Sequence, residues 1–229
     1  MSHTAAPMVA FIFDCDGTLV NSTPVWAYAQ PELLHRHGVD VTVDDFAQFE
    51  HLSLEAECQA YHDTWGIGEN GEELYRELSE ILIDGYSKVP PRKGLLAFLE
   101  QAKAEGIAMC VATSTPAELV QSALAGAGLD DYMELVTTTG EAGRSKQFPD
   151  VYELALRRLE ERHGCKFERA WVFEDAVFGL KSSGTAGFKR VGIYDPHGRM
   201  KRDDVRANCD IFIDSYEELD LARVLSFEG

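Results

Sequence analysis

Residues 9–19 read Val-Ala-Phe-Ile-Phe-Asp-Cys-Asp-Gly-Thr-Leu. The first five are apolar and rich in β-branched and aromatic side chains, which is typical of a strand buried on both faces of a parallel sheet. Two carboxylates, Asp14 and Asp16, follow where this strand ends, and Gly17 permits a tight turn. Ligands of open α/β sheets bind outside the carboxyl ends of the strands. We therefore expect a site here, with a metal ion to offset the repulsion between the two acids.

The chain after residue 91 alternates between strand-like and helix-like segments. Apolar runs predict strands at 107–112, 135–137, 170–173, 190–193 and 211–213. Helical periodicity predicts helices at 95–105, 116–127, 149–163, 177–186 and 217–225. This alternation indicates an α/β fold, a doubly wound, Rossmann-like parallel sheet with helices on both faces.

Residues 21–91 show helical periodicity and no convincing strand. Helices are expected at 25–38, interrupted by Pro31, at 53–65 and at 72–86, and Pro90-Pro91 marks the return to the sheet. The predicted division is an α/β core of residues 1–20 and 92–229 with an inserted α-helical cap domain of residues 21–91. We expect the cap to close about hinges near 20–24 and 90–94.

Composition limits the classes of partner and compartment. The net charge of −18 over 229 residues disfavours nucleic acid and anionic membranes as partners. The five cysteines are scattered and form no CxxC pair, which is typical of reduced thiols. From its sequence pattern we expect neither a signal peptide nor a transmembrane segment. We expect a cytoplasmic monomer or homodimer.

Three further groups of polar residues complete the expected site. Thr113-Ser114 follows the strand at 107–112, and Glu174-Asp175 follows the strand at 170–173. Lys146 precedes the helix that begins near residue 149. Carboxylate oxygens suit Mg²⁺, whereas a lysine and hydroxyl groups suit the oxygens of a phosphoryl group. The combination predicts phosphoryl-transfer chemistry.

The order and spacing of these motifs resemble the haloacid dehalogenase (HAD) superfamily of aspartate-nucleophile phosphotransferases. The DxDGT motif is matched in full by residues 14–18, and the Thr, Lys and acid-pair motifs are matched in order by Thr113, Lys146 and Glu174-Asp175. The helical insertion resembles the cap of the β-phosphoglucomutase-like subgroup. The chain departs from the usual pattern at Gln147, where proline is common, and at Ala176, where serine is common.

The resemblance implies a role for each matched residue. Asp14 would be the nucleophile and Asp16 the general acid and base. Asp16 also excludes the dehalogenase branch, which lacks this second aspartate. The phosphate would be bound by Thr113, Ser114 and Lys146, and Mg²⁺ would be bound by Asp14, Asp16 through its backbone carbonyl, Glu174 and Asp175.

The cap is expected to decide the substrate. Its lysine, Lys88, lies beside the hinge, which argues against Schiff-base chemistry of the phosphonoacetaldehyde hydrolase type. Leu54 stands where the mutases of the subgroup use an arginine for a second phosphate, and the cap holds 14 acidic and 3 basic residues. The expected function is hydrolysis of a small phosphorylated metabolite, a sugar phosphate or similar monoester, through an aspartyl-phosphate. A β-phosphoglucomutase-type phosphotransferase and a non-catalytic phospho-accepting or binding module stay open as alternatives.

Overall fold

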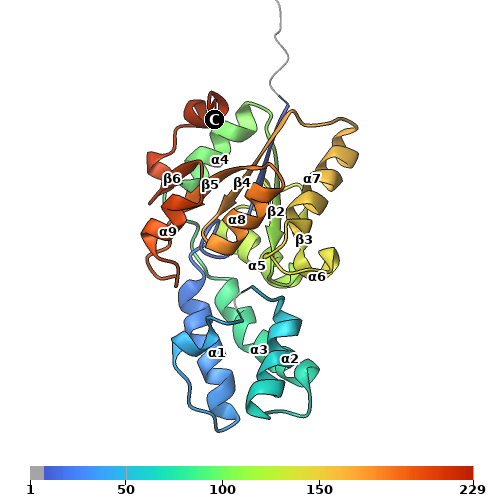
Figure 1. Ribbon diagram of the computed structural model, residues 1–229, viewed down its shortest axis with the longest axis vertical. Coiled ribbons are helices and arrows are strands. Elements are labelled where there is room, and N and C mark those ends of the chain that lie inside the picture. The colour runs from blue at the N-terminus through green and yellow to red at the C-terminus, as the bar shows by residue number, and fades with distance from the viewer. Residues whose placement is uncertain (1–7, 50, 229) are drawn as a thin grey trace, which may run out of the picture.

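A computed structural model describes residues 8–49 and 51–228. Its centre is a six-stranded, entirely parallel sheet with the strand order β3-β2-β1-β4-β5-β6 (Figure 1). This is the order of a doubly wound α/β fold, so the predicted fold class is confirmed. The strands are β1 (Val9–Phe13), β2 (Ala108–Thr113), β3 (Val136–Thr138), β4 (Arg169–Glu174), β5 (Lys189–Ile193) and β6 (Ile211–Ile213).

Strand β1 is buried along its whole length because helices cover both faces of the sheet. Phe11 and Phe13 face one cluster, in which they stack with Phe98 of α4 and Phe173 of β4. Ala10 and Ile12 point to a second cluster built with α7. The core helices are α4 (Leu95–Ala104), α5 (Ala117–Ala127), α6 (Thr139–Ala142), α7 (Asp150–His163), α8 (Val177–Thr185), α9 (Arg202–Ala207) and α10 (Leu221–Leu225).

The segment between β1 and α4 forms a separate group of helices at the end of the sheet (Figure 1). We call α1 (Thr23–Arg36), α2 (Leu54–Trp65), α3 (Gly71–Tyr86) and the 3₁₀ turn η1 (Val43–Phe46) the helical unit. Two connections join it to the sheet, and they run side by side. The Asn21 amide donates to the Pro90 carbonyl at 2.9 Å, and the Arg92 amide donates to the Leu19 carbonyl at 2.8 Å.

The strand register brings the predicted site residues to one edge. Phe13 lies opposite both Val111 of β2 and Phe173 of β4. The residues that follow these positions therefore emerge together, and the Asp14 amide donates to the Phe173 carbonyl at 2.9 Å. All three strands end at the edge of the sheet that faces the helical unit (Figure 1), so Asp14, Thr113 and Glu174 stand at that edge.

Two expectations about helices were wrong. Helix α1 continues through Pro31, because the burial of Leu33 and Leu34 offsets the one backbone hydrogen bond that proline cannot make. The expected helix at 217–225 is two pieces, the 3₁₀ turn η2 (Tyr216–Glu218) and α10. Leu219 is extended between them, and the Asp220 carboxylate caps α10 by accepting from the Ala222 amide at 3.0 Å. The short elements η1, α6 and α9 were not predicted.

Within residues 8–49 and 51–228, none of the helices is both long and apolar enough to span a bilayer.

Candidate active site

All seven residues singled out from the sequence line one pocket between the sheet and the helical unit. Asp14, Thr113 and Glu174 stand at strand ends, while Lys146 enters from the loop before α7. The same pocket is lined from the other side by residues of α1 and α2. The topology thus places an acid cluster opposite a wall formed by the helical unit.

Lys146 joins the two strands that flank its ammonium group. Its Nζ donates to Glu174 Oε1 at 2.9 Å and makes an ion pair with Asp14 Oδ1, and the lysine is 3% exposed. Burial by itself would lower the pKa of Lys146, but the Asp14 and Glu174 carboxylates raise it well above its usual value. The lysine is therefore a fixed positive charge. Ser182 holds its loop in place by donating to the Lys146 carbonyl at 2.6 Å.

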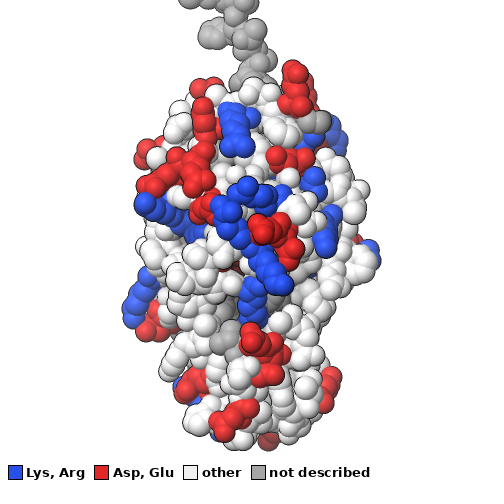
Figure 2. Space-filling model, turned by 60° about the vertical axis from the view of Figure 1, so that its left-hand side comes forward, with Lys and Arg blue, Asp and Glu red and all other residues white. Residues whose placement is uncertain are grey.

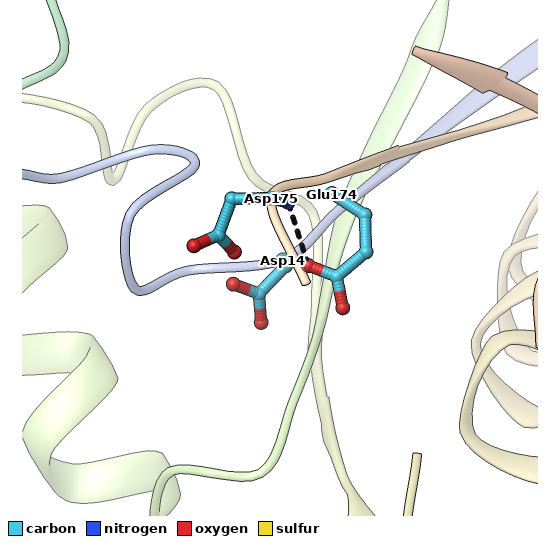
Figure 3. Close-up of side chains that lie close together, drawn as sticks. All are labelled: Asp14, Glu174 and Asp175. Atoms are coloured by element: carbon cyan, nitrogen blue, oxygen red, sulfur yellow. Dashed lines mark hydrogen bonds between the residues drawn. The ribbon is translucent and has the colours of Figure 1, made fainter. Parts of the chain in front are cut away.

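Asp14, Glu174 and Asp175 form a compact acid cluster (Figure 3). One oxygen of each carboxylate lies within 4.8 Å of the others, and Glu174 Oε2 accepts from the Asp175 amide at 3.0 Å. Burial, and next the negative charge of Glu174, raise the pKa values of Asp14 and Asp175 well above normal. One lysine cannot neutralise three clustered carboxylates. Because all the donors are hard oxygens, the cluster fits a Mg²⁺ ion.

Gly17 allows the turn that separates Asp16 from this cluster. Its φ of +76° is unfavourable for residues with a side chain, and a Cβ there would lie 2.5 Å from Asp175 Oδ2. The turn directs the Asp16 side chain away from the acids and toward the helical unit, where it accepts hydrogen bonds from Ser22 and Trp26. Asp14 and Asp16 therefore have different neighbours, although they are two residues apart.

The segment after β2 offers polar groups to an anion. Thr113 is buried, and its Oγ1 accepts from the Thr115 amide at 3.1 Å. The Ser114 Oγ is buried without a hydrogen-bond partner among the described residues. On the other side of Lys146, the Tyr152 hydroxyl donates to Glu174 Oε1 at 2.9 Å. The unpartnered Ser114 hydroxyl is a group that a bound phosphoryl oxygen would satisfy.

The sequence interpretation missed several residues of the pocket. Gln30 and Glu57 come from the bodies of α1 and α2, and Gln30 Nε2 donates to Glu57 Oε1 at 2.7 Å. The loop 197–200 contributes from the core. The sequence could have pointed to this loop, because it follows the predicted strand β5 and the acidic residue Asp195. In the structure, the charge of Asp195 contributes to the raised pKa of Asp175. Helix-body residues such as Gln30 give no comparable signal.

Known proteins are similar to this chain in sequence and in fold. A family model described as haloacid dehalogenase-like hydrolase matches residues 11–193. Validoxylamine A 7'-phosphate phosphatase from Streptomyces hygroscopicus subsp. limoneus is 27% identical over 214 residues, 91% of this chain and 94% of that protein. Phosphorylated carbohydrates phosphatase from Thermotoga maritima is 27% identical over 190 residues, 80% of this chain and 84% of that protein.

The fold recurs among solved structures. A mutant of CbbY from Rhodobacter sphaeroides, solved in complex with xylulose-(1,5)bisphosphate, superposes with a TM-score of 0.80 at 23% identity. The match covers 93% of this chain and 97% of that one. The likeness therefore includes both the sheet and the helical unit.

Proposed function

Because the chain belongs to the haloacid dehalogenase-like hydrolase family, we propose that it hydrolyses sugar phosphates or similar small monoesters through an aspartyl-phosphate on Asp14. The chain is a phosphoric monoester hydrolase, as its named phosphatase relatives are. The observation that carries the proposal is the placing of Lys146 between Asp14 and Glu174 at the end of the sheet. A fixed cation beside a buried carboxylate is what in-line attack on a dianionic phosphoryl group requires.

The proposed reaction has two steps. In the first, a carboxylate oxygen of Asp14 forms a bond to phosphorus while the bond from phosphorus to the leaving oxygen breaks, and Asp16 gives that oxygen a proton. In the second, Asp16 takes a proton from water, whose oxygen bonds to phosphorus as the bond to Asp14 breaks. Phosphate and an alcohol leave, and both aspartates return to their starting states. Thr113, the Ser114 amide and Lys146 hold the phosphoryl oxygens in this proposal.

The acid cluster is proposed to hold Mg²⁺ through Asp14, Glu174, Asp175 and the backbone carbonyl of Asp16. The cluster of hard oxygens and the surplus negative charge support this assignment. When bound, Mg²⁺ neutralises charge that develops on the phosphoryl oxygens.

The helical unit is proposed to act as the cap, residues 21–91, that receives the leaving group. Its described lining residues include Trp26, Gln30, Leu54 and Glu57, and it adds neither Lys nor Arg to the described pocket wall. On the face that Figure 2 shows, the charged side chains of the helical unit are mostly acidic, whereas the sheet domain carries Lys and Arg interspersed with Asp and Glu. The arginine that lines this pocket, Arg199, comes from the core loop 197–200. The described residues of the helical unit supply no Lys or Arg to a second phosphate, which supports a hydrolase over a mutase.

A phosphate-release screen tests the proposal. The purified protein is assayed with sugar phosphates, polyol phosphates and nucleotides, with Mg²⁺ or with excess EDTA, beside Asp14→Asn protein as the control for contaminating phosphatases. We expect Mg²⁺-dependent release from sugar or polyol monophosphates. Full activity in EDTA, or equal activity in the Asp14→Asn protein, would overturn the mechanism.

A further inference from the structure

Asp16 accepts hydrogen bonds from four side chains. Its Oδ1 accepts from Ser22 Oγ at 2.6 Å, from Trp26 Nε1 at 3.0 Å and from the Tyr86 hydroxyl. Its Oδ2 accepts from Thr115 Oγ1 at 2.7 Å. A surface aspartate exchanges its partners with water, whereas this carboxylate has a fixed set. Its orientation is therefore imposed by the protein.

The donors are unevenly divided between the two oxygens. A carboxylate oxygen offers about two lone-pair directions. Oδ1, with three donors, is saturated, whereas Oδ2 accepts from Thr115 alone among the described residues. Asp16 lines the pocket, so Oδ2 is the oxygen with an acceptor position left for substrate or water.

Three of the four donors belong to the helical unit or its entrance. Ser22 directly precedes α1, Trp26 lies in the first turn of α1, and Tyr86 is the last residue of α3. The rings of Trp26 and Tyr86 meet edge to face, with centroids 5.8 Å apart. The two ends of the inserted segment thus converge on one carboxylate, and only Thr115 comes from the core.

The Tyr86 hydroxyl is a hydrogen-bond donor to Asp16 and keeps its proton. The residue is fully buried, and burial together with the charge of Asp16 raises the pKa of its phenol well above normal. A buried hydroxyl that loses its partner pays the full desolvation cost, about 1–3 kcal/mol. Removing the Tyr86 hydroxyl takes away this fixed donor and leaves the Asp16 carboxylate freer to rotate.

We propose that Trp26 and Tyr86 are positioning residues that fix Oδ1 of Asp16, so that Oδ2 faces the pocket and gives its proton to the leaving oxygen. The proposal rests on the proposed function, since it concerns the acid of that reaction. The proton on Oδ2 passes to the leaving oxygen as the bond from phosphorus to that oxygen breaks. Asp16 is left as the carboxylate that later takes a proton from water.

Leaving-group dependence tests the proposal. The value of kcat/KM reports the first step, transfer of phosphorus to Asp14, for an alkyl monoester and for 4-nitrophenyl phosphate. An alkoxide needs a proton to leave, whereas 4-nitrophenolate does not. Trp26→Phe and Tyr86→Phe each remove one donor and keep an aromatic ring. Tyr75→Phe, on the same helix as Tyr86, removes a phenol that donates to Glu118 at 3.1 Å and serves as the control.

We expect kcat/KM for the alkyl ester to fall about 10- to 100-fold in Trp26→Phe and Tyr86→Phe, with the aryl ester nearly unchanged. Tyr75→Phe should change neither. Equal losses with both esters, or no loss with either, would overturn the positioning role and leave the phosphatase assignment standing. Wild-type protein that hydrolyses neither ester would overturn the proposed function as well. Thermal melts identify a variant that fails to fold, and Ser22→Ala, which removes a third donor to Oδ1, then takes its place with the same expectation.

Discussion

The core and the helical unit contribute to one pocket in different ways. In the core, Asp14, Thr113 and Glu174 each stand at the end of a buried parallel strand, so the sheet fixes their position. In the helical unit, the lining residues Gln30 and Glu57 lie in the bodies of helices and are placed by how those helices pack. Strand pairing fixes the positions of the core residues, whereas the positions of the helical-unit residues can shift when the packing of the helices changes. This difference supports the proposal that the core supplies the reacting groups and that the helical unit discriminates between leaving groups.

The two regions also differ in charge. Residues 21–91 carry a net charge of −11 out of −18 for the whole chain. The core supplies the buried lysine that faces the acid cluster. Since a phosphoryl dianion needs cations around it, we expect it to bind where the core places Lys146, with the rest of the substrate toward the helical unit.

The largest expected effect is that of Asp14→Asn. Loss of the nucleophile should lower kcat by at least about 10⁴-fold for every phosphate ester, because no covalent intermediate forms. Phosphate release measured in parallel on Asp84→Asn, an exposed residue of the helical unit that pairs with Lys88 at 2.6 Å, should equal that of wild type. Comparable losses of activity in the two variants would contradict the proposal that the nucleophile lies in the core.

Lys146→Met should have the next largest effect. The variant keeps most of the unbranched apolar part of the side chain but leaves the buried Asp14 and Glu174 without their cation. We expect kcat to fall about 10²- to 10³-fold, with a loss of about 3–5 kcal/mol in unfolding free energy without metal. Activity assays and denaturant unfolding measure the two effects. Lys166→Met, at an exposed lysine paired with Glu160, is the control, and a Lys146→Met protein as active as this control would contradict the proposed site.

Mg²⁺ should stabilise the fold. The pKa values of Asp14 and Asp175 are raised in the folded state, mainly by burial, above their usual value of 3.8. Their contribution to stability is therefore present at low pH and is lost as the pH rises above about 4, toward the folded-state pKa. At neutral pH and a concentration of Mg²⁺ about 100 times its Kd, Tm should rise by about 5–10 °C. An equal rise in Asp175→Asn would contradict binding at the cluster.

The smallest expected effect lies in the helical unit. Gln30→Met removes the amide that donates to Glu57 at 2.7 Å and keeps the volume of the side chain. We expect kcat/KM to shift about tenfold between sugar phosphates, while 4-nitrophenyl phosphate is hydrolysed as before. Gln59→Met, at an exposed residue that donates to Asp63, is the control. A large loss with every substrate would assign Gln30 to the chemistry instead.

The sequence predicted the sheet and the clustering of six of the seven site residues because these follow from strand ends; Lys146 lies in the loop before α7 and was found by its place in the motif order. A buried apolar run that stops at Asp14 or Glu174 indicates the carboxyl end of a strand, and in a parallel sheet these ends lie at one edge. The donors to Asp16 could not be found in this way. Tyr86 lies 70 residues from Asp16, and its approach depends on the packing of α3 against α1.

Local energetics explain the remaining errors. The break at Pro31 was expected from the missing amide, but the buried leucines of α1 outweigh it. The last predicted helix failed because Asp220 caps a new helix within it. In both places a contact made only in the folded chain overrides the local pattern.

Trapping the phosphoenzyme tests most directly whether the core performs the chemistry. Asp16→Asn protein, which keeps the nucleophile and lacks the base for the second step, is mixed with Mg²⁺ and 4-nitrophenyl phosphate, quenched in acid and digested for mass spectrometry. We predict that the peptide containing Asp14 gains the mass of one phosphoryl group, and that the Asp14→Asn, Asp16→Asn double variant gains none. Release of 4-nitrophenol by the Asp16→Asn protein without a phosphoryl group on Asp14, or with the group on another residue, would contradict the assignment of the reaction to Asp14.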